Sequence, residues 1–102
     1  MSGKPEIAIS DAEWRIVRDI LDKYVPGYSV WAFGSRARRT HKPFSDLDLA
    51  VCGDQPLTIS TLAALNEAFT ESDLPWKVDI VDEAAISDTF RRHIDAQKVA
   101  LQ

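Results

Sequence analysis

The chain has 102 residues, of which 45% are hydrophobic and 27% are charged, and its formal net charge at pH 7 is −4. This length can form one small core but not a catalytic domain with a separate binding domain, so we expect residues 1–102 to form a single domain. The composition excludes a disordered, collagenous or low-complexity chain. The negative charge argues against general nucleic-acid binding, for which a basic balance is typical.

Membrane and secretion signals are not expected in this sequence. No apolar stretch approaches the roughly 20 residues that cross a bilayer, and no apolar segment typical of a signal peptide follows the N-terminus. The single cysteine, Cys52, excludes an internal disulfide, and we expect it to be a small buried side chain at the end of a strand. These features predict a soluble protein in the reducing cytoplasm.

The first half of the chain predicts a helix followed by two strands. Ser10 and Glu13 have the spacing of a capping box, which starts a helix. An apolar stripe then continues at helical spacing through Trp14, Val17, Leu21 and Tyr24. Residues 28–33 are β-branched and aromatic and predict a strand that ends at Gly34. Residues 46–51 alternate between apolar and mostly polar side chains and predict a second strand.

The second half predicts a helix, a strand and a further helix. Residues 59–71 and 87–96 are the predicted helices, and residues 76–81 are the predicted third strand. Val99 and Leu101 predict a short edge strand. We therefore expect an α/β (α+β) domain with a small mixed sheet, whose helices pack on one face and whose other face is available for polar groups.

Carboxylates recur on one face of the predicted strands. Asp46 and Asp48 stand two residues apart, which places their Cα atoms roughly 6.5–7 Å apart on the same face. Asp79 has the same character in the third predicted strand. Hard divalent cations prefer oxygen ligands, and Mg2+ typically takes one or two carboxylates together with substrate phosphates. The three acids are a candidate metal site, although solvated acids on an exposed sheet face give the same pattern.

A Gly-Ser turn and a basic loop follow the first predicted strand. Gly34 permits close backbone approach, and Ser35 adds a hydroxyl and an N–H group that suit a phosphate. Four of the chain's twelve Lys and Arg residues follow within seven positions: Arg36, Arg38, Arg39 and Lys42. Local positive charge suits a polyphosphate. Taken alone, this segment is better explained as a solvated basic loop at a tight turn.

The two motifs together are far more specific than either alone. Gly34 and Ser35 are followed, after ten residues, by Asp46-Leu47-Asp48 and then by the strand acid Asp79. In this arrangement the sequence resembles the minimal nucleotidyltransferase (MNT) domains of the DNA polymerase beta superfamily, from the first helix to Leu101. Members of that family often have Gly at the position of Arg39, so the loop is stiffer and more basic here.

The resemblance implies a Mg2+-dependent enzyme that transfers AMP from ATP to a hydroxyl group. It implies that Asp46, Asp48 and Asp79 are catalytic and hold two Mg2+ ions. Asp79 would complete the ion site that activates the acceptor hydroxyl, and it is a candidate acceptor for the hydroxyl proton. The resemblance also implies that Gly34 and Ser35 hold the β- and γ-phosphates. Arg36 is a candidate phosphate partner.

MNT proteins of this size resemble the antitoxin half of toxin–antitoxin pairs, whose usual partner is a helical HEPN-domain RNase. The resemblance therefore implies transfer of AMP (AMPylation) to a hydroxyl of such a toxin, with a tyrosine as the expected acceptor, and a hetero-oligomer. Three alternatives stay open. The chain could be a non-catalytic nucleotide-binding antitoxin, a small-molecule nucleotidyltransferase completed by a second subunit, or a single-strand RNA binder, which the net charge disfavours.

Overall fold

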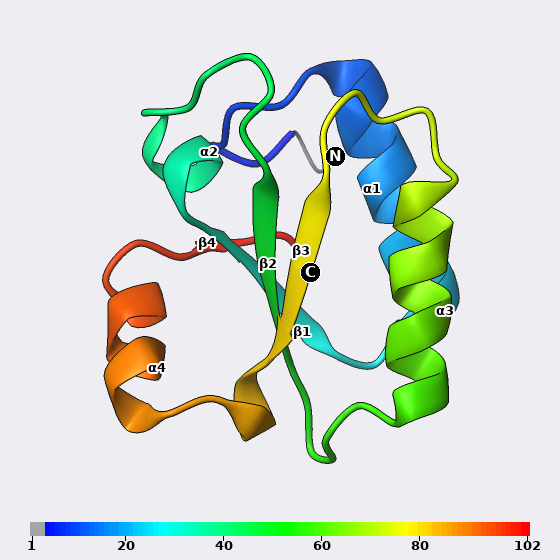
Figure 1. The fold of residues 1–102 in the computed structure, drawn as a ribbon, viewed down its shortest axis with the longest axis vertical. Helices are drawn as coiled ribbons and strands as arrows, with labels where there is room; N and C mark the ends of the chain where they lie inside the picture. The colour runs from blue at the N-terminus through cyan, green and yellow to red at the C-terminus, as the bar shows by residue number, and fades with distance from the viewer. Residues whose placement is uncertain (1–3) are drawn as a thin grey trace.

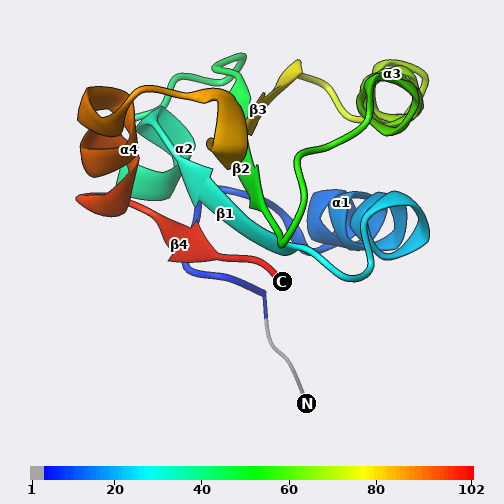
Figure 2. The ribbon, with the colours of Figure 1, turned by 90° about the horizontal axis from the view of Figure 1, so that it is seen from below.

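The computed structural model describes residues 4–102, which form a sheet with helices on both of its faces. The helices are α1 (Asp11–Tyr24), α2 (Ser35–Arg38), α3 (Ile59–Thr70) and α4 (Asp88–Asp95). The strands are β1 (Ser29–Phe33), β2 (Leu47–Cys52), β3 (Val78–Asp82) and β4 (Val99–Ala100). Helices α1 and α3 lie side by side, and α4 lies on the other side of the sheet (Figure 1, Figure 2). The expected mixed α/β class is confirmed.

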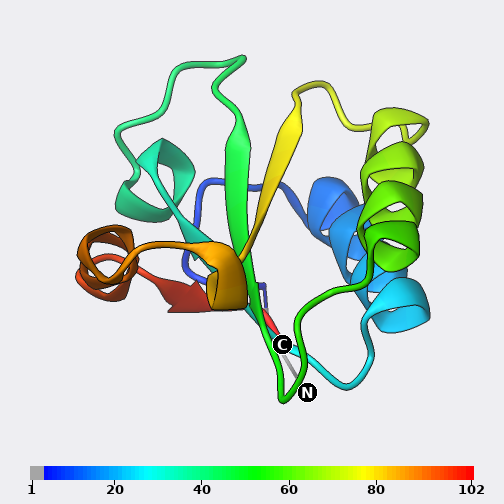
Figure 3. The ribbon, with the colours of Figure 1, turned by 60° about the horizontal axis from the view of Figure 1, so that its bottom comes forward.

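The sheet is mixed, and its register determines which side chains meet. The strand order is β3-β2-β1-β4, with β2 antiparallel to β1 and parallel to β3. Phe33 at the end of β1 lies opposite Asp48, and Asp48 lies opposite Asp79 near the start of β3. The last residue of β1 therefore lies beside the first residues of β2 and β3, which run in parallel (Figure 3).

Helix α1 begins as its sequence predicts. The Ser10 hydroxyl accepts the N–H of Glu13, and the Glu13 carboxylate accepts the N–H of Ser10, which completes the capping box. The helix then buries its apolar stripe in the main core, which lies between the sheet and α1 with α3. Within residues 4–102, no helix is long and apolar enough to cross a membrane.

A second, smaller core lies on the opposite face of the sheet. Phe33, Ala50 and Ile94 are buried there, and Phe90 packs against them. We expected all helices on one face, but the apolar side of α4 covers part of the other face, because small Ala50 leaves room for it. On this face, only the part of the sheet outside this cluster, which includes Asp48 and Asp79, remains open to polar groups. Cys52, which we expected to be buried, is exposed because it is the last residue of β2, outside both cores.

Candidate active site

The three predicted acids come together at one end of the sheet. Asp48 and Asp79 are register partners on the face that α4 partly covers, and Asp46 immediately precedes β2. All three are half-buried. A cavity of about 710 Å3 opens beside them, and it is lined by Phe33, Asp48, Asn66, Thr70, Lys77, Val78, Asp79, Ile80, Val81 and Phe90. The sheet register therefore concentrates negative charge beside a cavity that is large enough for a nucleotide.

Proximity perturbs the ionisation of these acids. A hydrogen bond with the Asp79 carboxyl is the main cause that raises the pKa of Asp46, followed by burial. Burial, together with the charges of Asp79 and Asp46, raises the pKa of Asp48 to about 6. The nearest cation is Lys77, whose Nζ lies 3.3 Å from Asp79 Oδ1. One exposed lysine does not neutralise three carboxylates, so protons or another cation must balance the charge.

The donor set fits a hard divalent cation. Three carboxylates supply only oxygen ligands, which is the chemistry that Mg2+ prefers, and the raised pKa values of Asp46 and Asp48 indicate a site that favours added positive charge. Among residues 4–102, no three His, Cys, Asp or Glu side chains already have the geometry of a metal site. Asp79 is paired with Lys77 instead. The binding of Mg2+ therefore stays a prediction.

This electrostatic arrangement predicts a dependence of stability on pH. The pKa of Asp48 rises on folding from its ordinary 3.8 to about 6, so the folded state binds the Asp48 proton more tightly than the unfolded state does. The contribution of Asp48 to stability is therefore greatest below its unfolded pKa and is lost as pH rises through this window. We expect thermal unfolding with a chelator present to show this decline. Added Mg2+ should raise the unfolding temperature at neutral pH more than at acidic pH, because protons compete with the metal. Equal Mg2+ effects at both pH values would contradict a carboxylate site.

Gly34 packs directly against one of the acids. Its φ is +79° and its ψ is −162°, which is a conformation that glycine alone adopts readily. A Cβ added at this position would overlap the Asp48 carboxylate. The glycine therefore lets the turn between β1 and α2 approach the acids at van der Waals distance. Ser35 follows as the first residue of α2, where backbone N–H groups have no partner within the helix.

Arg36 lies elsewhere than we expected for a phosphate partner. Its side chain is buried, and its guanidinium donates to three backbone carbonyls: Ser45 at 2.8 Å, Ala8 at 2.9 Å and Pro43 at 3.0 Å. The guanidinium also lies over the Trp76 ring, 4.4 Å from its centroid. Burial lowers the pKa of Arg36, and the charges of Glu13 and Asp46 partly oppose this shift. Arg36 thus fixes the loop that leads into Asp46, and it points away from the cavity.

The position of Arg36 predicts a large loss of stability on truncation. Arg36→Ala removes a buried side chain and leaves three partly buried carbonyls without their donor, so we expect the free energy of unfolding to fall by about 3 kcal/mol or more. For a domain of this size, that loss lowers the unfolding temperature by more than about 10 °C. Arg38→Ala is the matched control, because Arg38 is exposed and makes no hydrogen bond or ion pair through its side chain within residues 4–102. Lost nucleotide binding with unchanged stability in Arg36→Ala would instead favour a phosphate contact.

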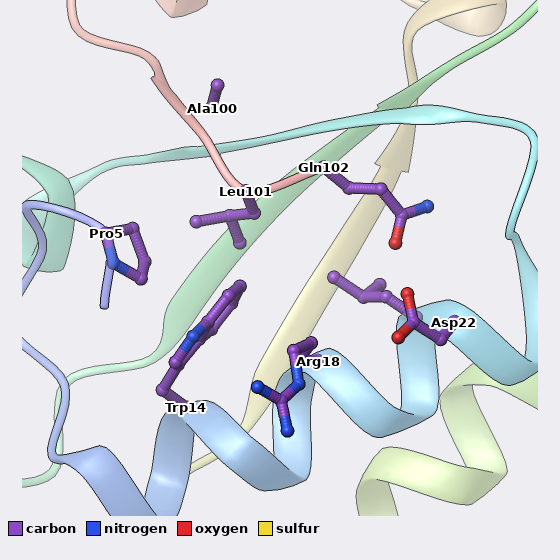
Figure 4. A pocket seen from close by; sticks show the side chains of 8 residues that line it. Pro5, Trp14, Arg18, Asp22, Ala100, Leu101 and Gln102 are labelled. Carbon is purple, nitrogen blue, oxygen red and sulfur yellow. The ribbon is translucent and has the colours of Figure 1, made fainter. Parts of the chain in front are cut away.

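A second cavity, of about 340 Å3, lies away from the acids between α1 and the C-terminal segment (Figure 4). Its lining includes Trp14 and Arg18 of α1 and Leu101 near the end of the chain. Asp22 supplies the one acidic side chain among the described residues that line it. Because paired acids and the Gly-Ser turn are both remote from it, this cavity does not offer the chemistry of the first one.

Two residues at the site were not predicted from the sequence. Lys77 pairs with Asp79, and its position two residues earlier on the same strand face was a usable signal. Gln97 accepts the N–H of Gly34 through its side-chain oxygen at 2.8 Å. No local pattern could have indicated this contact, because 63 residues separate the two positions.

A strand–turn–helix segment that brings a Gly-Ser turn against paired strand carboxylates is the arrangement expected of a nucleotidyltransferase. Comparison with known proteins agrees. The nucleotidyltransferase domain family matches residues 14–100, and the chain belongs to this family. The sequence is 45% identical, over the whole chain and 90% of the relative, to a protein of Haemophilus influenzae (strain ATCC 51907 / DSM 11121 / KW20 / Rd) named probable protein adenylyltransferase MntA. The resemblance found in the sequence is thus confirmed.

Solved structures with the same fold come from toxin–antitoxin complexes. One, a toxin–antitoxin with AMP-PNP, has a TM-score of 0.74 at 24% identity and matches 87% of this chain and 72% of the other. Another contains a tri-AMPylated HEPN toxin of Shewanella oneidensis with its MNT antitoxin, and its TM-score is 0.66 at 21% identity, over 87% of this chain and 68% of the other. At these identities the likeness establishes the fold.

Proposed function

We propose that this protein is a Mg2+-dependent adenylyltransferase that transfers AMP from ATP to a hydroxyl of a HEPN-type toxin and thereby acts as its antitoxin. The main support is the register of the sheet, which pairs Asp48 with Asp79 beside a turn whose Gly34 touches Asp48. Transfer chemistry requires such acids next to a phosphate-binding turn. A cytoplasmic location is part of this proposal, because ATP, the proposed donor, is available there.

The proposed reaction is an in-line displacement at the α-phosphorus of ATP. The acceptor oxygen forms a bond to phosphorus, the bond to the β-phosphate oxygen breaks, and pyrophosphate leaves. The hydroxyl proton passes to Asp79, which lies on the edge of the cavity and is partly exposed. Bound Mg2+ would supply charge stabilisation for the entering and leaving oxygens. Asp46 and Asp48 would hold two such ions, and Asp79 would complete the ion site nearest the acceptor.

The phosphates are assigned to the turn after β1. Ser35 offers a backbone N–H and a hydroxyl, and neither makes a hydrogen bond within residues 4–102. Gly34 contributes its close approach to Asp48, because its own N–H is already bonded to Gln97. Ser35 is therefore the principal donor to the β- and γ-phosphates in this proposal. Arg36 stabilises the site indirectly, because its guanidinium donates a hydrogen bond to the carbonyl of Ser45, the residue before Asp46.

The acceptor and the partner are assigned from the relatives. The protein of Haemophilus influenzae is named a probable protein adenylyltransferase, and the Shewanella oneidensis complex pairs an MNT antitoxin with an AMPylated HEPN toxin. Tyrosine is the expected acceptor side chain, and a hetero-oligomer is the expected assembly. Purified protein, its HEPN partner, ATP and Mg2+ should give a mass increase of one or more AMP units on a toxin tyrosine. Neutralisation of the toxin without any mass increase would favour the non-catalytic antitoxin.

Ser35→Ala tests the assignment of the phosphates. One hydroxyl hydrogen bond contributes about 0.5–1.5 kcal/mol, so we expect the dissociation constant of ATP with Mg2+ to rise by about two- to tenfold. Isothermal titration calorimetry measures this change. Ser60→Ala, at an exposed position on α3, should leave the affinity unchanged. A loss of transfer as complete as that of an aspartate variant would mean that Ser35 does more than bind phosphate.

A further inference from the structure

Gln97 links the Gly-Ser turn to the C-terminal helix. This residue follows α4, and its side-chain oxygen accepts the N–H of Gly34 at 2.8 Å. The contact is partly buried. A partly buried hydrogen bond to an amide acceptor restricts the direction of the peptide group that donates it. The turn is therefore tied to an element that enters the fold more than sixty residues later in the sequence.

The Gln97 amide is itself held in place from the other side. Gln97 Nε2 donates to the backbone carbonyl of His93 at 3.2 Å. It also lies 3.1 Å from the ring nitrogen Nε2 of His93. The His93 ring stacks on Phe90, with 6.1 Å between their centroids, and Phe90 meets Phe33 edge-on at 5.9 Å. Phe90 of α4 thus contacts the last residue of β1, and Gln97 contacts the residue that follows it. The acceptor oxygen is thus aimed at Gly34 by packed neighbours.

Gly34 has no backbone group left for a nucleotide in this arrangement. Its N–H is bonded to Gln97, and its carbonyl accepts the N–H of Arg38 at 3.0 Å. Its Cα faces the Asp48 carboxylate so closely that no side chain fits. The N–H, the carbonyl and the Cα of Gly34 are therefore all restrained by contacts. These restraints also set the direction in which Ser35 presents its N–H and hydroxyl.

We propose that Gln97 is a positioning residue for nucleotide binding, which sets the Gly34–Ser35 turn without contacting the nucleotide itself. This inference rests on the proposed function, because it assigns Ser35 as the phosphate donor. Gln97 acts only through the orientation of Ser35. Replacing Gln97 should therefore weaken nucleotide binding by way of Ser35 and by no other route.

A double-mutant cycle on the affinity for ATP with Mg2+ tests this route. Gln97→Met keeps the length of the side chain but removes the amide oxygen, and we expect the dissociation constant to rise about three- to tenfold. In a Ser35→Ala background, which lacks the hydroxyl but keeps the backbone N–H at position 35, the same substitution should raise the constant by a smaller factor than it does in the wild type. Additive effects would overturn the proposal. Tighter binding by Gln97→Met would also overturn it, because Gln97 would then compete with the phosphates.

A control variant and amide hydrogen exchange separate the role of Gln97 from other effects on nucleotide binding. Gln55→Met, at an exposed position in the turn after β2, is the matched control and should leave the affinity unchanged. Amide hydrogen exchange should find Gly34 protected in the nucleotide-free wild type and unprotected in Gln97→Met, and an unprotected wild-type Gly34 would overturn the contact. Absence of ATP binding by the wild type would overturn the proposed function and the role of Gln97 together. Wild-type binding that Gln97→Met leaves unchanged would overturn the role of Gln97 alone.

Discussion

Asp79→Asn should abolish AMP transfer while leaving nucleotide binding within a few-fold of the wild type. The carboxylate is the group assigned to complete the ion site beside the acceptor and to take the hydroxyl proton, and an amide does neither. We expect a loss of at least about 1,000-fold in turnover, because several kcal/mol of transition-state stabilisation depend on such a group. Asp46 and Asp48 remain to hold the nucleotide with its metal. Single-turnover transfer and calorimetric binding of ATP measure the two effects separately.

The same substitution should not destabilise the fold. Removing one of three neighbouring carboxylates relieves repulsion, and the ion pair that is lost with Lys77 is partly exposed and contributes little. We therefore expect the unfolding temperature of the metal-free variant to equal or exceed that of the wild type. Asp54→Asn is the control, because Asp54 is exposed and makes no ion pair within residues 4–102. Wild-type turnover in Asp79→Asn would show that the metal and proton assignments are wrong.

Gly34→Ala should also lower AMP transfer strongly. The positive φ of this residue strains any side chain by about 1–3 kcal/mol, and the new Cβ would overlap the Asp48 carboxylate. The turn and the acid must then separate. A shift of about 1 Å at reacting groups can lower a rate by about 100-fold, so we expect at least this loss of transfer, together with lower stability.

A matched glycine variant separates the close approach from a general effect of losing glycine. Gly27 also lies in a turn, but a Cβ added there meets no atom within 4 Å. Gly27→Ala should therefore retain the transfer rate and nearly the same unfolding temperature. Equal rates of transfer by the two alanine variants would show that the contact between Gly34 and Asp48 is not needed for catalysis.

Much of the fold could be predicted because local signals agree with the packing. The Ser10–Glu13 capping box and the strict alternation around Leu49 each specify an element without tertiary information. The position of α4 could not be predicted in this way. Its apolar residues Phe90 and Ile94 indicate a buried stripe, but the sheet face that it covers depends on the space beside Ala50.

Part of the candidate site could likewise be predicted from the sequence, and part of it could not. The acids and the Gly-Ser turn are recognisable because their spacing along the strands is part of the motif, and the sheet register brings Asp48 and Asp79 together. The role of Arg36 was not predictable, since a basic residue beside a phosphate-binding turn looks the same in sequence whether it points outward or inward. Its partners Ala8 and Ser45 are backbone carbonyls, which carry no sequence signal. The contact between Gln97 and Gly34 depends on tertiary structure alone.

Asp46, Asp48 and Asp79 are proposed to carry out the transfer of AMP to a protein. The most direct measurement is the incorporation of α-labelled ATP, with Mg2+, into proteins of a native host lysate, with the wild type compared with Asp46→Asn. We predict one small labelled protein of the HEPN type with the wild type and none with the variant. No label with the wild type, despite binding of ATP that depends on Mg2+, would contradict protein transfer and favour a binding-only antitoxin or a small-molecule acceptor. Equal labelling by both proteins would show that Asp46 is not catalytic.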